Sequence, residues 1–218
     1  MTNPAVTSSL ADRIADLGEI PADRVRCDPS PGTATLEDLI RVNERRDGRC
    51  ELIDGTLVEK AVGWQESLLT GVLLRWLGTY VAEKNLGVVT GPDGMIRLFS
   101  DTVRGPDVAF FSWPRLPGGT LPEAPVPDLI PDLAIEVLSA GNTRAEMARK
   151  RREYFHAGVR LVWIVHPRSR TIAVYTSSED VTVAEDGDII DGGSVLPGWQ
   201  VDTTLLFAEL DRKAPPNA

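Results

Sequence analysis

The feature that most constrains the fold of this chain is a stretch near its middle with the order strand, helix, strand. DLAIEVLS at 132–139 is a nearly continuous apolar run with one carboxylate at its centre, as expected of an interior strand. Thr143 and Glu146 form a capping box, which predicts the start of a helix. Gly158 predicts the end of that helix, and the apolar residues 161–165 predict a second buried strand. A helix between two buried strands is typical of a crossover unit with parallel strands, so the chain is predicted to be mixed α/β.

The segments around this unit predict a sheet flanked by helices. Asp54-Gly55 separates two runs rich in strand-forming residues, which is a strong signal for a tight β-hairpin. The apolar residues of Trp64 to Asn85 form one stripe at helical spacing and predict the main packing helix. Residues 112–131 carry six prolines and predict an irregular surface loop. A short helix is predicted from Thr35, and short strands over 88–89, 95–99, 107–111, 171–175, 181–183 and 189–190, with residues 205–210 closing the domain.

The length of the chain, 218 residues, is that of a single domain. Residues 1–32 contain four prolines among small and charged residues, and we expect them to form a poorly ordered N-terminal arm. The domain is then expected over residues 33–212, followed by a frayed tail at 213–218.

Composition narrows the classes of function. The net charge of −9 and the pI near 4.8 argue against binding of polyanions by the whole surface, while leaving room for a local basic patch. Cys27 and Cys50 are the only cysteines, and the first residues lack a basic start followed by an apolar run. We therefore expect a cytoplasmic protein without a disulfide framework. No apolar stretch approaches the roughly 20 residues that a membrane helix needs.

Two carboxylates lie in unfavourable surroundings. Asp107 follows Pro106 at the start of the strand-like run VAFF, and Glu136 is the single charge in its apolar run. A lone ionised carboxylate among apolar residues is costly unless it is paired, hydrogen-bonded or bound to a cation. If the two strands are neighbours, the pair could ligate Mg²⁺, which one or two carboxylates typically bind together with water and phosphate oxygens. The alternative is structural: Asp107 caps a turn after Pro106, and Glu136 pairs with an arginine such as Arg151.

The helix that follows this strand is strongly basic. Residues 144–152 include five basic residues and one acid, which gives a local charge of +4. Arg151 shares a face with the apolar residues of the helix and Lys150 lies at the edge of that face, so at least one cation is expected to point inward. A basic helix beside a carboxylate-bearing strand fits the handling of phosphate groups; the alternative is a solvated helix face. Residues 177–191 carry six acids and no basic residue, so the acidity is concentrated elsewhere.

Five segments of the chain resemble a known family. They are CELIDG (50–55), GPD (105–107), PDLAIEVLS (131–139), NTRAEMARKRREY (142–154) and GVRLVWIVHP (158–167). In this order and spacing they are similar to the Uma-type restriction endonucleases, formerly a domain of unknown function, in the PD-(D/E)XK nuclease superfamily. The resemblance covers about residues 35–210. It implies a restriction-endonuclease-like core, with a mixed β-sheet flanked by helices, in which Asp107 and Glu136 bind Mg²⁺ or Mn²⁺.

The resemblance also implies roles for further residues. The lysine of the superfamily normally lies two residues after the strand glutamate, where this chain has Leu138. In Uma-type sequences a lysine four residues before the helix tyrosine takes its place, here Lys150, and would orient or deprotonate the attacking water or balance charge on the phosphate. Glu51 matches the early acid of the family and is expected to ligate the metal directly or through water; the alternative is an exposed strand residue beside a tight turn. His166 stands where many relatives carry aspartate, and it lies either at the rim of the site or in a structural role.

These observations predict a divalent-metal-dependent endonuclease that hydrolyses phosphodiester bonds, with DNA as the default substrate by resemblance. The predicted catalytic residues are Asp107, Glu136, Lys150 and Glu51, of which Asp107 and Glu136 hold the metal. Two other functions stay open: a catalytically silent nuclease-fold module that binds or regulates a partner, and a metal-dependent phosphoesterase acting on RNA or small nucleotides. Because nucleases of this fold that cut both strands often act as dimers, a homodimer is expected.

Overall fold

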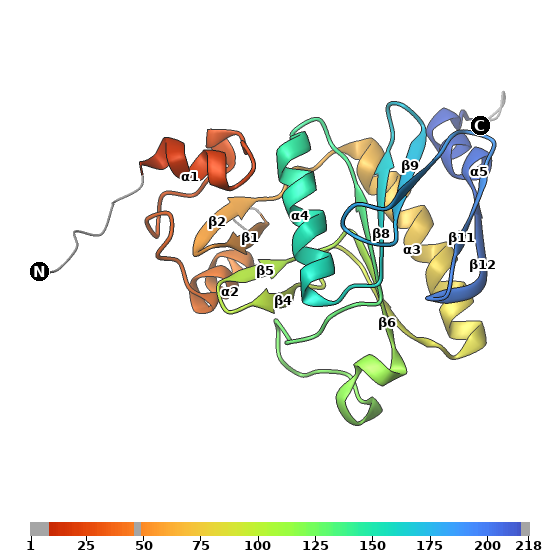
Figure 1. Cartoon of the computed structure of the whole chain (residues 1–218), viewed down its shortest axis with the longest axis horizontal. Coiled ribbons are helices and arrows are strands. Elements are labelled where there is room, and N and C mark those ends of the chain that lie inside the picture. The colour runs from red at the N-terminus through yellow and green to blue at the C-terminus, as the bar shows by residue number, and fades with distance from the viewer. Residues whose placement is uncertain (1–8, 46–48, 215–218) are drawn as a thin grey trace, which may run out of the picture.

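The computed structural model describes residues 9–45 and 49–214 (Figure 1). Its α-helices are α1 (Leu10–Asp16), α2 (Leu36–Glu44), α3 (Trp64–Lys84), α4 (Arg144–Ala157) and α5 (Thr203–Ala208). Short 3-10 helices lie at Ala22–Arg24, Trp113–Arg115, Pro117–Gly119 and Glu209–Asp211. Its strands are β1 (Cys50–Ile53), β2 (Thr56–Glu59), β3 (Gly87–Thr90), β4 (Ile96–Phe99), β5 (Thr102–Arg104), β6 (Val108–Ser112), β7 (Leu133–Val137), β8 (Leu161–His166), β9 (Thr171–Tyr175), β10 (Val181–Ala184), β11 (Ile189–Gly192) and β12 (Leu196–Asp202).

These strands form a six-stranded sheet, a four-stranded sheet and a two-stranded hairpin. The six-stranded sheet has the order β10-β9-β8-β7-β6-β3, in which β7 and β8 are parallel and the other neighbours are antiparallel. β7, α4 and β8 therefore form the predicted crossover unit. The four-stranded sheet has the order β2-β1-β5-β4, and β11 pairs with β12. The predicted fold class, a mixed β-sheet flanked by helices, is confirmed.

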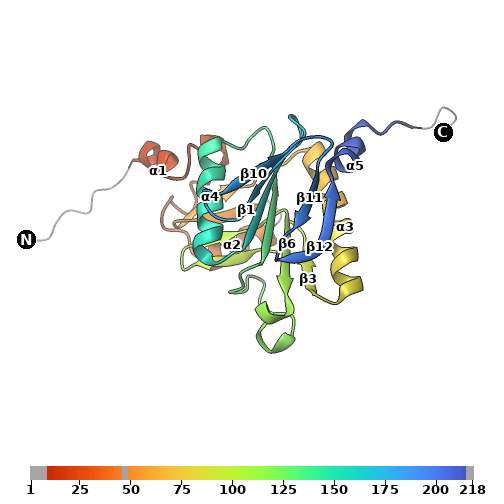
Figure 2. The same cartoon turned by 45° about the vertical axis from the view of Figure 1, so that its right-hand side comes forward.

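Helices cover both faces of the six-stranded sheet, as Figure 2 shows. α3, α5 and the β11-β12 hairpin pack on one face, and α4 packs on the other. In β7, Ile135 and Val137 belong to the core on the α3 side, whereas Ala134 belongs to the core on the α4 side. Because side chains alternate between the two faces of a strand, Glu136 faces α4.

Local signals explain the elements that frame the site. α4 begins at the predicted capping box, in which the Thr143 hydroxyl accepts a hydrogen bond from the Glu146 N–H at 2.9 Å, and it ends at Gly158 with a φ of 103°. Asp54 and Gly55 have φ values of 47° and 67°, the positive values that a type I′ turn requires. This turn fixes the register of β1 and β2, and with it the place of Glu51.

Residues 9–32 differ from the expected poorly ordered arm. Leu17, Ile20 and Val25 are buried and pack against the β1-β2 hairpin. Leu17 lies in the turn after α1, Ile20 lies outside any regular element, and Val25 forms a bridge with Val58, so no single helix or strand links the three and periodicity could not reveal this contact. The ends of the chain, 1–8 and 215–218, lie outside the described residues, and that part of the predicted arm and tail stays a prediction.

Two strands were missing from the sequence prediction. β5 ends at Arg104 and lies between the strands that the sequence predicts over 95–99 and 107–111. β12 contains Pro197 and Gly198, two residue types that disfavour strands, and it is held by its pairing with β11.

In the part of the chain that the structure describes, no helix has the length and apolar character needed to cross a membrane.

Candidate active site

The predicted acids Asp107 and Glu136 lie beside each other on neighbouring strands. β6 and β7 are antiparallel, and Val108 lies opposite Ile135. Asp107 immediately precedes β6, so the next pair along the ladder is Asp107 and Glu136. Both side chains line one small cavity. The structure therefore places the two acids of the GPD and LAIEV motifs at a common point.

Residues from distant parts of the chain line this cavity. They are Arg24 from the N-terminal segment, Glu51 from β1, Lys60 and Ala61 after β2, Asp107 before β6, Glu136, Val137, Leu138 and Asn142 from β7 and the turn after it, and Glu146 and Lys150 from α4. Glu51, Glu136 and Lys150 are 2%, 5% and 4% exposed. Charges this deeply buried must be compensated by neighbouring groups or by a ligand.

Lys150 is the cation that balances Glu136. Its Nζ lies 3.0 Å from Glu136 and 3.0 Å from Oε1 of Glu51. The Tyr154 hydroxyl donates a hydrogen bond to Glu136 Oε1 at 2.6 Å. Burial lowers the pKa of Lys150, but the two carboxylates outweigh burial and hold this pKa above its ordinary value, so the amine is charged at neutral pH. Burial raises the pKa of Glu136 against the opposing charge of Lys150.

Glu51 is buried and anchored, so the alternative of an exposed strand residue is wrong. Nη1 of Arg104 donates to Glu51 Oε2 at 2.8 Å, and the Gly105 N–H donates to Oε1 at 3.0 Å. Arg104 is fully buried and also binds Glu153. Burial raises the pKa of Glu51, but Lys150 and Arg104 outweigh burial and hold this pKa well below its ordinary value. With donors on both oxygens, Glu51 is placed to orient Lys150.

Lys60 is a charged residue of the site that the sequence analysis missed. Its side chain is 8% exposed, and its Nζ lies 3.1 Å from Asp107 Oδ1 and donates a hydrogen bond to the Gly105 carbonyl. The other carboxylate oxygen, Oδ2, accepts from the Val137 N–H at 2.8 Å. The sequence does indicate that Asp107 requires a compensating cation. It does not indicate that Lys60 is this cation, because the two residues are 47 positions apart and no local spacing links them.

The structure does not pair Arg151 with Glu136. The Arg151 guanidinium lies 4.5 Å from the centre of the Tyr175 ring and 4.0 Å from Glu179. The inward-pointing cation of α4 is Lys150. His166 ends β8, where it is half-buried and its burial lowers its pKa, and it is not one of the cavity-lining residues named above.

The donor chemistry of Asp107 and Glu136 fits a divalent cation. Mg²⁺ is usually bound by one or two carboxylates and keeps several of its water ligands. Within residues 9–45 and 49–214, no group of three or more His, Cys, Asp or Glu side chains is placed to hold a metal ion. A metal here would therefore rely on two carboxylates, with its other positions left to water and phosphate. In the structure each of the two carboxylates is paired with a lysine.

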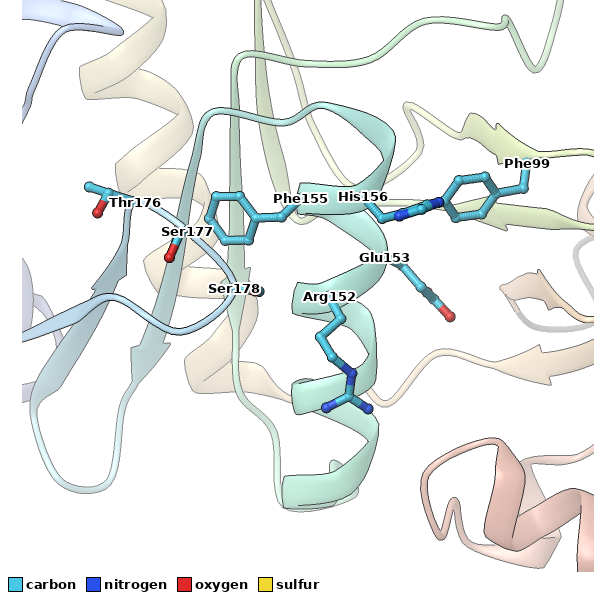
Figure 3. A pocket seen from close by; sticks show the side chains of 8 residues that line it. All are labelled: Phe99, Arg152, Glu153, Phe155, His156, Thr176, Ser177 and Ser178. Carbon is cyan, nitrogen blue, oxygen red and sulfur yellow. The ribbon is translucent and has the colours of Figure 1, made fainter.

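A broader depression lies across the outer side of α4 and lacks this chemistry. Figure 3 shows Phe155 pointing toward Ser177 on one side of the helix and His156 beside Phe99 on the other. Its lining residues are Phe99, Arg152, Glu153, Phe155, His156, Thr176, Ser177 and Ser178. Glu153 is the one carboxylate in this lining, and it is already bound by Arg104 and Arg149. The depression thus offers no pair of acids for a metal.

Comparisons with known proteins show the fold and the family of this chain. A crystal structure described as "a putative nuclease belonging to DUF820", from Anabaena variabilis ATCC 29413, matches with a TM-score of 0.70 and 20% sequence identity. The match covers 81% of this chain and 98% of that chain, so the two share a fold. The model of the Uma2 family, described as "Putative restriction endonuclease", matches residues 35–205. The chain belongs to this family, which confirms the resemblance seen in its motifs. None of the curated proteins matches the chain.

Proposed function

We propose that the protein is an endonuclease that hydrolyses phosphodiester bonds of DNA with the help of Mg²⁺ or Mn²⁺. The observation that carries this proposal is the convergence of Asp107, Glu136 and Lys150 on one cavity in a member of the Uma2 family. Two carboxylates can hold a hard cation, and a charged amine beside them can bind a phosphate oxygen. Together they suit a reaction in which negative charge develops on phosphate.

Each residue of the cavity has a distinct role in this mechanism. Asp107 and Glu136 would hold the metal ion, which when bound polarises phosphate oxygens and increases the acidity of water. Lys150 stays protonated, so it acts as a hydrogen-bond donor rather than as a base, and its Nζ would contact a non-bridging phosphate oxygen. Glu51 holds Lys150 in position through their 3.0 Å contact. Tyr154 fixes the orientation of Glu136 through its hydroxyl.

The proposal extends to the partner and the compartment. DNA is the proposed substrate because the family description names restriction endonucleases. A homodimer is proposed because a cut in both strands needs two sites, and the described chain brings Asp107 and Glu136 to a single cavity. The cytoplasm is the proposed compartment, supported by Cys27 and Cys50, which are not joined in a disulfide.

The test is cleavage of supercoiled plasmid by the full chain with Mg²⁺, Mn²⁺ or EDTA. We expect cutting with either metal, none with EDTA, and none by Glu136→Gln, which keeps the shape of the side chain and removes its charge. Glu83→Gln, on the exposed face of α3, is the matched control and should cut like the wild type. Short RNA and free nucleotides, run in parallel, separate a DNA endonuclease from a phosphoesterase. Equal cutting by the wild type and Glu136→Gln would contradict the proposal.

A second candidate function is a nuclease-fold module that binds a partner without cutting. One observation favours it: Asp107 and Glu136 are already neutralised by Lys60 and Lys150. In that case no substrate is cut with any metal, and calorimetry detects no Mn²⁺ binding to the wild type. Cutting that is lost in Glu136→Gln would exclude this second candidate.

A further inference from the structure

The carboxylates that line the cavity are paired with cations without a metal ion. Glu51 contacts Lys150 and Arg104, Glu136 contacts Lys150, Asp107 contacts Lys60, and Glu146 contacts Arg24. A divalent cation would add two charges that nothing in this set compensates. Because most of these groups are almost completely buried, water screens the excess poorly. Metal binding therefore favours the departure of one resident cation.

Lys60 is the cation best placed to leave. Arg104 is fully buried and is held by Glu51 and Glu153, and Lys150 is shared between two buried acids. The contacts of Lys60 are one carboxylate, that of Asp107, and one backbone carbonyl. Its side chain is long and unbranched and starts directly after β2, so its ammonium can move while the backbone stays in place.

A second cavity next to the first gives the ammonium a place to go. The two cavities share Lys60, Ala61, Asp107 and Val137. The wall of the second cavity also includes Arg49, Glu66, Ser67 and Thr70. Glu66 supplies a carboxylate, and the two hydroxyl residues supply further acceptors. Lys60 thus lies at the boundary between the metal-binding acids and a polar space that can receive it.

A metal ion and Lys60 would use the same atom. Nζ lies 3.1 Å from Oδ1 of Asp107, and the other oxygen of this carboxylate is bound by the Val137 N–H. Two positive charges on one carboxylate oxygen repel each other. The carboxylate attracts the ammonium less strongly than the divalent ion, because the ammonium carries half the charge.

We propose that Lys60 is the resident counter-ion of Asp107 and that a divalent cation binds by displacing its ammonium toward the second cavity. The inference rests on the proposed metal site at Asp107 and Glu136. Lys60 then sets the metal concentration at which the site fills. It is a positioning residue, because it acts through Asp107.

Calorimetric titration of Mn²⁺ into the full-length protein tests the inference. Lys60→Met keeps the unbranched shape and removes the charge, and it should bind Mn²⁺ about tenfold more tightly than the wild type. Lys60→Arg keeps the charge and should bind no more tightly than the wild type. Lys84→Met, at the exposed end of α3, makes the same change in net charge and should leave the Kd within about twofold of the wild type.

Thermal unfolding gives a second readout that needs no turnover. Without metal, Lys60→Met leaves Asp107 without its cation, so its Tm should be below that of the wild type. Saturating Mn²⁺ should then raise the Tm of the variant by more than it raises that of the wild type, because tighter binding stabilises the folded state more. Lys60→Gln serves for both measurements if Lys60→Met does not fold.

The outcomes separate this inference from the proposed function. If Lys60→Met binds Mn²⁺ no more tightly than the wild type, and the wild type cuts plasmid, the role of Lys60 is overturned and the proposed nuclease function is retained. Absence of Mn²⁺ binding in every protein overturns both. In the background of Asp107→Asn, the Lys60→Met substitution should give no gain in Mn²⁺ affinity, so the double variant Lys60→Met/Asp107→Asn should bind Mn²⁺ no more tightly than Asp107→Asn alone. A gain that persists there would show that Lys60 acts elsewhere, and would contradict the inference.

Discussion

Asp107 and Asp132 have the same local sequence, a proline before and a strand after, and different surroundings. Asp107 lines the cavity. Asp132 is buried, and its carboxylate accepts hydrogen bonds from the Ser112 N–H at 3.0 Å and from Arg115 Nε at 3.1 Å. Asp132 therefore joins the start of β7 to the end of β6. The partners, which are distant in sequence, decide which aspartate is structural.

Replacing Asp132 should change stability in a pH-dependent way. Burial raises the pKa of Asp132, but hydrogen bonds from Ser112 and Arg115 outweigh burial and keep this pKa below its ordinary value. Such a group stabilises the fold above the pKa of the unfolded chain, and the contribution is lost as the pH falls through the lower folded pKa. Asp132→Asn should lower the free energy of unfolding by about 1.5–3 kcal/mol at neutral pH.

Urea unfolding at two pH values checks this prediction. The difference between Asp132→Asn and the wild type should shrink below about pH 4, where the aspartate of the unfolded chain takes up its proton. A difference that stays constant from neutral pH to about pH 3 would contradict the assigned role.

Lys150 and Arg151 are adjacent in α4 and should respond differently to substitution. Lys150 contacts Glu51 and Glu136, whereas Arg151 lies over the ring of Tyr175. Lys150→Ala should lower the turnover of plasmid by about 10²–10³, the usual cost of removing one donor to a developing charge. The Kd of Lys150→Ala for Mn²⁺ should be no higher than that of the wild type, because the variant retains the metal-binding acids Asp107 and Glu136.

Arg151→Ala is the control and should cut plasmid like the wild type. Lys150→Arg, which keeps a charged donor, should recover part of the lost turnover. If Arg151→Ala alone abolished cutting with Mn²⁺ binding retained, the catalytic cation would be Arg151.

At the scale of elements, local signals predicted what local contacts stabilise. The capping box of α4 and the Asp54-Gly55 turn depend on residues within four positions of each other, so sequence alone locates them. Asp107 and Glu136 could be singled out because a buried carboxylate is costly wherever it lies. Lys60 could not be, because its role exists only once folding brings Asp107 to it.

Non-local pairing also explains the elements that were missed. β5 is three residues long and is held by pairing with β1 and β4. Its buried Arg104 forms ion pairs with Glu51 of β1 and Glu153 of α4. The segment at 9–32 is likewise held by contacts with the β1-β2 hairpin and with α4. No pattern within either segment carries that information.

This N-terminal segment braces two elements that carry site residues. Arg24 donates to both oxygens of Glu146, at 2.8 and 3.0 Å, and to the carbonyls of Gly141 and Glu59 at 2.8 and 2.7 Å. These contacts connect the end of β2, next to Lys60, with the start of α4. The segment precedes the range that the family model matches. It is therefore a part of this chain that supports the site from outside the matched region.

Removing Arg24 should destabilise the fold through Glu146. Burial raises the pKa of Glu146, but Arg24 outweighs burial and keeps the pKa below its ordinary value. Arg24→Ala leaves this buried charge without its main partner and should cost about 3–5 kcal/mol. Urea unfolding of Arg24→Ala, Glu146→Gln and the double variant should give a coupling energy of about 0.5–3 kcal/mol.

The control for this cycle is Arg41→Ala. Arg41 pairs with Asp38 on the exposed side of α2, where ion pairs contribute little, so its removal should leave the unfolding midpoint almost unchanged. Additive effects of the Arg24 and Glu146 substitutions would contradict the bracing role.

For the whole molecule, the distribution of charge restricts how two copies can associate. β10 is an outer strand of the six-stranded sheet, and its Val181 and Val183 are 46% and 56% exposed. Residues 177–191 surround it with six acids and no basic residue. Charged residues beside an open edge strand oppose pairing with another strand. Edge-to-edge pairing would bring the acids of the two copies together, so we expect the proposed homodimer to use another surface.

The proposed homodimer makes the products of plasmid cutting depend on protein concentration. A protomer with one cavity cuts one strand per encounter, whereas a dimer cuts both, so dilution should shift the products from linear to nicked plasmid. Gel analysis over a dilution series, with the mass of the protein measured at the same concentrations, checks this. An excess of Glu136→Gln mixed with the wild type should reduce linear product more steeply than nicked product, because most dimers then hold one working site. The contrary outcome is a ratio of linear to nicked plasmid that is the same at every protein concentration and is unaffected by the inactive variant. That outcome would mean that the protein acts as a monomer, which cuts the two strands in separate encounters.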